Sequence, residues 1–328
     1  MESPLTDRRL GRLVRVLQEN AMVVVSGTKL GEEIGTSRSE VWRLVQQLRG
    51  LGVEIAGHPA TGYQLKKVPD LLLPDVLAPL LKGSSFGEIR HYFKIDSTNA
   101  AAMEAAAAGA AEGTVFVSEE QTAGQGRGGH GWESERSSGI YCSAVLRPAL
   151  LPGDALLISL AAGLAVVAAV EEVTGMKPDL RWPNDVLAPG GRKFCGILTE
   201  MNAEPTRVRY LVVGIGINVN QREFPRAIAE IATSLRMETG REWSRVELAA
   251  ALLKSLDREY AALRSEPHSR LLRRFERNSS TARGCRVQVE EQGGYDGITE
   301  GLDERGFLQV RGASGLRAVL SGGVRPVS

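Results

Sequence analysis

Residues 121–132 read QTAGQGRGGHGW, and the rest of the chain can be interpreted from this stretch. Five glycines and one arginine, Arg127, crowd into it. So many glycines let the backbone approach a ligand closely, and exposed N–H groups in such a loop bind anionic oxygens. The arginine adds a forked, charged donor. The stretch indicates either an anion-binding loop or a plain flexible surface loop. It has neither the phosphate-loop spacing nor the dinucleotide-binding spacing.

Two later stretches favour the ligand-binding interpretation. Residues 181–186 read RWPNDV and are followed by GGRKFCGIL at 190–198, while residues 213–220 read VGIGINVN. Together with the glycine-rich loop, in this order, they resemble the catalytic domain of biotin protein ligases. That domain is related in fold to the class II aminoacyl-tRNA synthetases and to the lipoate ligases. The resemblance covers residues 93–220, and its most specific part is the Trp-Pro-Asn-Asp run with a lysine eight residues after the aspartate.

The glycine-rich loop departs from the family pattern at two positions. The family usually has Gly-Arg-Gly-Arg, with a further arginine before the tryptophan. Here Gln125 replaces the first arginine, and His130 stands where the later one usually lies. Each change removes a forked donor for phosphate oxygens, so we expect weaker phosphate clamping. This keeps open a regulator that only senses biotin. A lipoate-type ligase is a second alternative, because its catalytic fold is similar.

The resemblance implies an ATP-dependent ligase that forms biotinyl-5'-AMP. The biotin then passes to a lysine of the biotin carboxyl-carrier protein domain of acetyl-CoA carboxylase. Neither step needs a protein nucleophile, so catalysis would rest on alignment and on neutralisation of charge. The implied ligands are ATP, Mg2+ and biotin, with the magnesium bridging phosphates and taking few protein ligands. The implied catalytic residues are Arg127, Asp185 and Lys193.

The resemblance also implies the ligand contacts. The implied biotin-binding residues are Ser97, Thr98, Asn99, Gln121, Gln125, Gly126, Arg127, Lys193 and Gly196. The implied ATP- or adenylate-binding residues are Gly124, Gly126, Arg127, Trp132, Asn184, Asp185, Lys193 and Asn218. Ordinary structural roles remain open for some of them: Ser97 or Thr98 as a helix N-cap, and Asp185 as a turn residue. Cysteines and histidines are scattered, so we predict no metal site made by the protein.

The first 68 residues predict a winged helix-turn-helix domain. Apolar residues recur at helical spacing in residues 7–19, and a short helix is expected at 29–34. A third helix starts at Ser37, and Glu40 three residues later completes a capping-box signature. Alternating apolar residues around a turn at 57–59 predict a hairpin. The third helix is the candidate DNA reader, through Ser37, Arg38, Arg43, Gln46 and Gln47. A protein-contact domain is the alternative.

The rest of the chain predicts an α+β architecture. Residues 69–280 are expected to form a class II synthetase-like, mixed-sheet catalytic domain. Its expected strands are 91–95, 114–119, 139–146, 193–201 and 210–219, and its expected helices are 100–111, 155–173, 224–234 and 246–263. Residues 281–328 alternate short apolar runs with glycines such as Gly293, which predicts a β-barrel of about five strands. By the resemblance this barrel is SH3-like. Trp42 is expected in the core of the N-terminal domain, with stacking on a DNA base as the alternative.

Composition and charge limit the classes of function. The 328 residues are 43% hydrophobic and 24% charged, as in a soluble protein of two or three domains. A net charge of +1 restricts nucleic-acid binding to a local patch. The polar residues 1–15 predict no signal peptide, and the apolar run 155–170 predicts a buried helix better than a membrane span. We therefore expect a cytoplasmic protein without a membrane partner. The resemblance implies that it binds operator DNA as a homodimer when the adenylate is bound.

Overall fold

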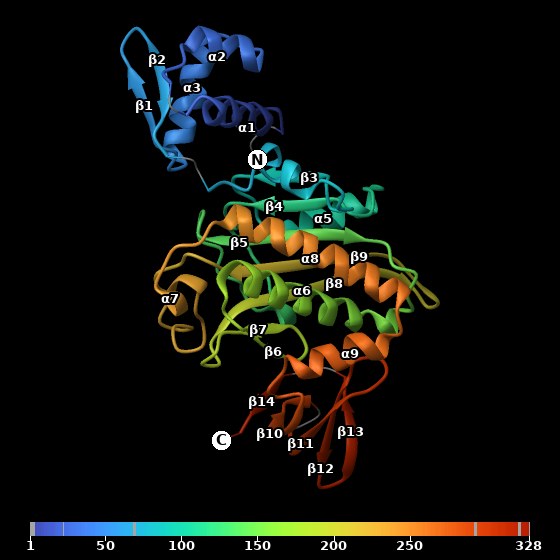
Figure 1. The fold of residues 1–328 in the computed structure, drawn as a ribbon. Coiled ribbons are helices and arrows are strands. Elements are labelled where there is room, and N and C mark those ends of the chain that lie inside the picture. Colours follow the sequence, from blue (N-terminus) through green and yellow to red (C-terminus); the bar gives the residue numbers. More distant parts are fainter. Residues whose placement is uncertain (1–3, 22, 68–69, 292–293, 321–322, 328) are drawn as a thin grey trace.

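Three groups of elements follow one another along the chain in a computed structural model (Figure 1). The structure describes residues 4–21, 23–67, 70–291, 294–320 and 323–327. The expected boundary between residues 68 and 69, the residue Gly293 and both chain ends lie outside the described residues.

The first group is a helix-turn-helix followed by a hairpin. Its elements are α1 (Pro4–Glu19), α2 (Gly27–Ile34), α3 (Arg38–Gly50), β1 (Ile55–His58) and β2 (Gly62–Leu65). Ser37 caps α3 as expected, because its hydroxyl accepts the N–H of Glu40 (3.2 Å). The residue between the second and third helices that turns the chain is Gly35, which adopts φ +69°. The three helices and the hairpin share one apolar cluster, the N-terminal core.

The expectation that Trp42 lies in this core is wrong. Its side chain is 58% exposed. The buried face of α3 is formed by Val41, Leu44, Val45 and Leu48, and Trp42 lies about 100° around the helix from Val41. It therefore stands on the solvent side of α3, on the same helix as the candidate DNA-binding residues.

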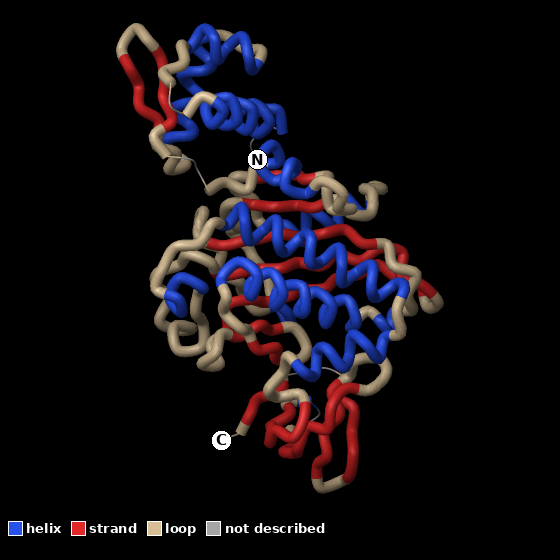
Figure 2. The backbone as a smooth tube through the Cα atoms, in the orientation of Figure 1, coloured by secondary structure: helices blue, strands red, loops and turns tan. Residues whose placement is uncertain are grey.

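The second group is built on a seven-stranded mixed sheet of order β3-β4-β5-β9-β8-β7-β6. Its strands are β3 (Ile89–Tyr92), β4 (Val115–Ser118), β5 (Gly139–Leu146), β6 (Asp179–Arg181), β7 (Asp185–Leu187), β8 (Lys193–Glu204) and β9 (Arg207–Asn218). The β3–β4 pair is parallel, and the other pairs are antiparallel. Figure 2 shows the strands side by side across the middle of the molecule, with helices packed over them.

The two faces of this sheet are covered differently. The long helices α6 (Leu156–Thr174) and α8 (Arg245–Ser265) cover one face, where the main apolar core lies (Figure 1). Helix α5 (Thr98–Ala107) covers part of the other face through a smaller cluster that includes Val145 and Val212. The remaining helical elements of this group are α4 (Pro74–Leu77), η1 (Ala78–Leu81), η2 (Arg127–Gly129), η3 (Pro152–Asp154), α7 (Leu235–Thr239) and α9 (His268–Arg277).

The apolar helix expected near residues 155–173 is part of the protein core. The helical stretch Pro152–Thr174 is long and apolar enough to cross a membrane, with a mean hydropathy of 2.1. However, 72% of that window is buried inside the protein. The prediction of a buried helix is confirmed.

The helix expected at residues 224–234 is absent, and a short helix begins only at Leu235. The backbone there pairs with a strand instead. The N–H of Lys193 donates to the carbonyl of Ile231 (2.8 Å), and the N–H of Thr233 donates to the carbonyl of Lys193 (2.9 Å). Residues 226–231 therefore form turns, and Ala232 makes an isolated parallel bridge with Lys193, the first residue of β8.

The third group is a five-stranded antiparallel sheet of order β13-β12-β11-β10-β14. Its strands are β10 (Arg283–Val289), β11 (Tyr295–Leu302), β12 (Leu308–Gly312), β13 (Gly315–Val319) and β14 (Val324–Pro326). The turn between β11 and β12 reaches back to the second group. There the indole N–H of Trp182 donates to the carbonyl of Gly306 (2.9 Å). Gly306 lies against Leu157 and Leu160 of α6, where a Cβ would come within 2.8 Å of Leu160.

A buried carboxylate joins the segment before α4 to the sheet. Glu119, just after β4, is fully buried. It accepts from the backbone N–H of Leu72 (2.8 Å) and from the guanidinium of Arg245 (2.8 Å), and His91 Nε2 lies 3.3 Å away. Burial raises the pKa of Glu119, but the Arg245 charge and the His91 hydrogen bond outweigh it and hold this pKa at about 2. Glu119 is therefore ionised whenever the protein is folded near neutral pH.

This depressed pKa predicts a pH dependence of stability. A carboxyl whose pKa is lower in the folded chain stabilises the fold above its unfolded pKa and loses that effect as pH falls. For Glu119 the loss falls between its ordinary value of 4.5 and about 2. We expect Glu119→Gln to lower the free energy of unfolding at about pH 7, with a gap to wild type that shrinks at about pH 3. Urea unfolding at the two pH values measures this, and an undiminished gap at low pH would contradict it.

Candidate functional site

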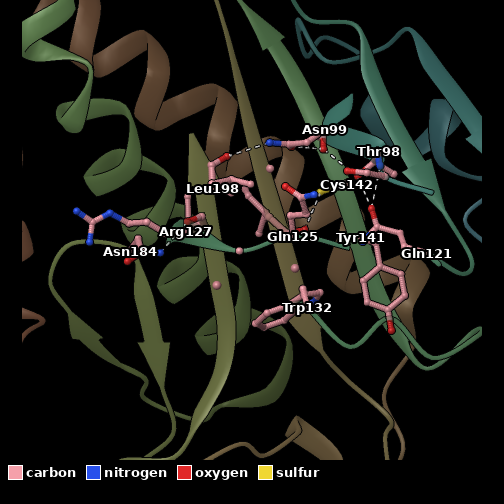
Figure 3. A pocket seen from close by; sticks show the side chains of 18 of the residues that line it. Thr98, Asn99, Gln121, Gln125, Arg127, Trp132, Tyr141, Cys142, Asn184 and Leu198 are labelled. Carbon is pink, nitrogen blue, oxygen red and sulfur yellow. Dashed lines mark hydrogen bonds between the residues drawn. The ribbon is translucent and has the colours of Figure 1, made fainter. Parts of the chain in front are cut away.

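A hollow on the α5 face of the large sheet is the candidate site, and glycines create its space. In the antiparallel register, Tyr141 faces Gly216, Ser143 faces Gly214, and Gly196 faces Gly216 from the other side. Alternate residues of a strand point to the same face. These glycines, which have no side chain, therefore leave room beside the N-terminus of α5 (Figure 3).

One end of the hollow is lined by a chain of hydrogen bonds. Gln121 Oε1 accepts the backbone N–H of Thr98 (2.8 Å), and its amide donates to Ser134 Oγ (2.9 Å). The Thr98 and Ser143 hydroxyls are 2.9 Å apart, and Ser143 donates to Asn99 Oδ1 (2.6 Å). Figure 3 shows Thr98, Asn99 and Gln121 converging on one side of the pocket. The arrangement offers hydroxyl and amide groups to a neutral polar ligand.

Glu200, which was not anticipated from the sequence, anchors this series of hydrogen bonds. Its carboxylate accepts from Asn99 Nδ2 (2.8 Å). The amide oxygen of Asn99 is therefore turned toward Ser143, because the nitrogen is held by Glu200. Gly214 leaves the space for this side chain, since a Cβ there would lie 2.1 Å from Asn99 Oδ1.

The other end of the hollow is cationic. Lys193 Nζ lies 2.5 Å from Asp185 Oδ1 and 5.4 Å from the centroid of a Trp132 ring. Arg181 donates to the second oxygen of Asp185 (2.6 Å). Asn184 donates to the carbonyl of Ile197 (2.9 Å), which fixes the turn before β7. Ammonium and amide donors therefore lie within reach of an anionic group bound over Gly196.

The glycine-rich loop folds over the sheet as a small closed turn. Gly126 N–H donates to the carbonyl of His130 (2.7 Å), and Trp132 N–H donates to the carbonyl of Gly124 (2.9 Å). A Cβ at Gly124 would lie 2.7 Å from the carbonyl of Trp132, so glycine is required there. The Trp132 ring covers Gly196 and Gly216. Its indole N–H is buried and has no hydrogen-bond partner in the described part of the chain.

The structure brings most of the expected site residues together. Those that line the hollow are Ser97, Thr98, Asn99, Gln121, Gln125, Gly126, Arg127, Trp132, Asn184, Lys193 and Gly196. Three expected residues lie outside the lining. Gly124 is at the base of the loop, Asp185 lies behind Lys193, and Asn218 is buried and donates to the carbonyl of Thr233 (3.1 Å).

The lining also contains residues that sequence reasoning missed. They are Tyr141, Cys142, Ser143, Ile197, Leu198, Gly214, Ile215 and Gly216. Both strands that carry the central ones were expected. The register of β5 on β9 was not, and only that register places Tyr141 and Ser143 opposite the two glycines.

The pocket offers no activated nucleophile among its lining residues. Burial raises the pKa of the Cys142 thiol to about 12, and burial also raises the pKa of the Tyr141 hydroxyl. Tyr141 donates to the carbonyl of Glu135 (2.9 Å). Both groups stay protonated near neutral pH, so covalent catalysis by either is unfavourable. In the described ranges, no group of three or more His, Cys, Asp or Glu side chains is placed to hold a metal ion.

Comparison with known proteins agrees with this geometry. Residues 93–218 match the model of the biotin/lipoate A/B protein ligase family, and residues 9–64 match that of a helix-turn-helix domain. The bifunctional ligase/repressor BirA of Bacillus subtilis is 33% identical over 315 residues, which is 94% of this chain and 96% of that protein. The chain belongs to the BirA family of bifunctional ligase/repressors.

Two further relatives support the family assignment. The biotin–[acetyl-CoA-carboxylase] ligase of Mycobacterium tuberculosis is 37% identical over 69% of this chain and 84% of that protein. The biotin protein ligase of Aquifex aeolicus, solved in complex with biotin and ATP, superposes with a TM-score of 0.65 at 32% identity. That alignment covers 74% of this chain and all of the Aquifex chain. The family predicted from the three motifs, the mixed sheet and the N-terminal helix-turn-helix are thus confirmed.

Proposed function

We propose that this chain is an ATP-dependent biotin protein ligase that also acts as a biotin-responsive transcriptional repressor. The observation that carries the ligase function is the pocket itself. Neutral hydrogen-bonding groups line one end of it, and Lys193 and the glycine-rich loop lie at the other. This polarity suits a ligand with a polar ring at one end and a carboxylate at the other.

The roles of the pocket residues follow from that polarity. Thr98, Asn99 and Gln121 would bind the ureido ring of biotin. They are already held in place, Thr98 and Asn99 by Ser143, Asn99 also by Glu200, and Gln121 by Ser134. The carboxylate would then lie near Lys193, where the α-phosphate of ATP must meet it. Lys193 and Arg127 would stabilise the negative charge that develops as biotinyl-5'-AMP and pyrophosphate form.

Magnesium fits the cationic end only as a phosphate-bound ion. Mg2+ binds one or two carboxylates together with phosphates and water. Asp185 is the carboxylate beside Lys193, and both of its oxygens are already bonded, to Lys193 and to Arg181. When bound, Mg2+ would supply neutralisation of the phosphate charge. Asp185 itself would hold Lys193 in position and leave few direct protein ligands for the ion.

The second half-reaction would transfer biotin to a lysine of the carrier domain of acetyl-CoA carboxylase. A side cavity supports an approach from the edge of the sheet. It shares Arg127, Asn184, Ile197 and Leu198 with the main pocket and opens toward Met201, which is 41% exposed. An amine entering there would reach the cationic end of the pocket without crossing the biotin-binding end.

Repression would require a dimer, and the topology offers an edge for it. Strand β7 pairs with β8 only at its beginning, from Lys193 to Gly196. Residues 198–204 of β8 have no strand on that side within the described part of the chain. An open strand edge pairs readily with a second copy. Two winged helices on such a dimer would meet two half-sites of operator DNA.

We further propose the domain limits 1–68, 69–280 and 281–328, with an SH3-like barrel in the last. Five antiparallel strands support the barrel, and register shifts bend β10 and β11. A cytoplasmic location, without a membrane partner, fits the buried position of the apolar helix α6.

The test of the ligase function is biotin-dependent exchange of labelled pyrophosphate into ATP, with lipoate as the control acid. We expect exchange with biotin and none with lipoate. Exchange with lipoate alone would show that the acid substrate is lipoate and not biotin. Tight biotin binding without exchange would instead identify a biotin sensor. The repressor function is tested by titrating promoter DNA upstream of biotin-synthesis genes, with and without biotin and ATP, and a footprint that ignores both ligands would refute it.

A further inference from the structure

A buried ion pair lies at the base of the glycine-rich loop, and the catalytic mechanism does not use it. The carbonyl of Glu119 accepts the N–H of Ser137 (2.9 Å), and its carboxylate accepts the Ser137 hydroxyl (3.1 Å). Arg245 donates to the same carboxylate (2.8 Å) and to the carbonyl of Gly139 (3.1 Å). Residues 120–136, which carry the loop, therefore leave and return to the sheet at one Glu–Arg pair.

The same pair holds the segment that follows the DNA-binding domain. The N–H of Leu72 donates to Glu119 Oε1 (2.8 Å), and Arg245 also donates to the carbonyl of Asp70. The Asp70 carboxylate accepts the first two backbone N–H groups of α8, those of Arg245 (2.9 Å) and Val246 (3.0 Å). Residues 70–72 are thus fastened to the base of the loop by both backbone and side-chain bonds.

Neighbouring side chains of this segment face different cores. Leu72 packs in the main core of the catalytic sheet, whereas Leu71 and Leu73 pack in the N-terminal core. Phe93, four residues before Ser97 of the pocket, also packs in the N-terminal core. A shift of residues 70–73 would therefore be felt by the DNA-binding domain, because two of its core side chains belong to this segment.

Because it is buried, the ion pair at the base of the loop is favourable only when it is fully formed. Both Glu119 and Arg245 are fully buried, and separating such a pair leaves an uncompensated charge in a medium of low polarity. A partial release is therefore unfavourable, and the loop base and residues 70–72 must move together or not at all. Concerted movement of these two segments would couple the loop to residues 70–72.

We propose that Asp70, Glu119 and Arg245 couple the state of the glycine-rich loop to the DNA-binding domain. Binding of biotin and ATP stabilises the closed loop and its base and so holds residues 70–72 in place, which orients the winged helix. The inference rests on the proposed repressor function. Asp70 and Arg245 are positioning residues in this scheme, since neither lines the pocket.

The deciding variants are Asp70→Ala and Ser244→Ala in the full-length protein. Both remove a cap from the same end of α8, because Ser244 Oγ accepts the N–H of Glu247 (3.2 Å). Only Asp70→Ala also removes the side-chain bonds that fasten residues 70–72 to α8. We expect Asp70→Ala to lower the gain in DNA affinity produced by biotin and ATP by roughly fivefold or more, the usual size of such coupling. Pyrophosphate exchange should stay within about threefold of wild type, the same tolerance as for other residues that touch no substrate.

Ser244→Ala should keep the full gain in DNA affinity at a similar loss of stability. An undiminished gain in Asp70→Ala would overturn the coupling. An equal loss in both variants would overturn it as well, because fraying of α8 would then suffice.

A second measurement separates this inference from the repressor function. Hydrogen exchange at the amide of Leu72 should slow when biotin and ATP are added to wild type, and it should not slow in Asp70→Ala. If biotin and ATP do not change DNA binding in wild type, the repressor function fails. The hydrogen-exchange rate at Leu72 then decides alone whether the loop is coupled to residues 70–72. Ligand-independent exchange at Leu72 would then remove the coupling too.

Discussion

Replacing Lys193 by alanine should lower biotin-dependent pyrophosphate exchange by about a hundredfold or more, as loss of a charge-stabilising donor does. Lys193 lines the hollow, with its ammonium between Asp185 and the Trp132 ring. The loss should appear mainly in kcat, because the charge that Lys193 meets grows during adenylate formation. Biotin binding measured by calorimetry should change much less.

Arg192 provides the matched control for this variant. It carries the same charge one residue earlier, but it donates to Glu238 of α7 (2.7 Å) and does not line the hollow. Arg192→Ala should keep exchange within about threefold of wild type, as expected for an exposed ion pair outside the site. Full exchange in Lys193→Ala, or an equal loss in both variants, would show that position 193 has no special role.

Adding one methyl group at Gly214 should weaken biotin binding by roughly tenfold to a hundredfold, the range that overpacking of about 1–3 kcal/mol gives. The new Cβ would lie 2.1 Å from Asn99 Oδ1 and 2.8 Å from its Cγ. The Asn99 side chain cannot move away from the new methyl group, because Glu200 and Ser143 hold its amide. Calorimetric titration of Gly214→Ala with biotin measures the effect.

Two companion variants make the cause identifiable. Gly190→Ala adds the same methyl group where no atom lies within 4 Å, so biotin affinity should not change. If Gly214→Ala acts through Asn99, it should add little on top of Asn99→Ala, because both changes remove the same contact. Full additivity of the two changes would contradict that route.

The sequence predicts the parts of this protein that depend on local signals. Ser37 and Ser97 cap their helices as side-chain acceptors must, and the glycine-rich loop meets the Trp-Pro-Asn-Asp turn because both belong to one family pattern. The parts that could not be predicted depend on how neighbouring strands are paired and in which register. Ser143 and Glu200 became site residues only through the register of β5, β9 and β8.

Two predictions of local structure are wrong, for different reasons. The expectation that Trp42 is buried fails because the helix turns its side chain away from the apolar stripe. Residues 224–234 were expected to be helical, but the backbone of Ile231 and Thr233 pairs with Lys193 across the chain. Only in the second case is the decisive neighbour distant in sequence, so that the local pattern carried no information about it.

The bond between Trp182 and Gly306 has a consequence for the order in which the protein is made. The two residues are 124 positions apart, and the carbonyl that receives the indole N–H belongs to the turn between β11 and β12. During synthesis, the ribosome delivers the Trp-Pro-Asn-Asp turn long before this support exists. Until the last strands emerge, α6 keeps Leu157 and Leu160 uncovered where Gly306 will lie. The side cavity that Phe307 and Leu320 help to line is therefore completed only when the final strands have left the ribosome.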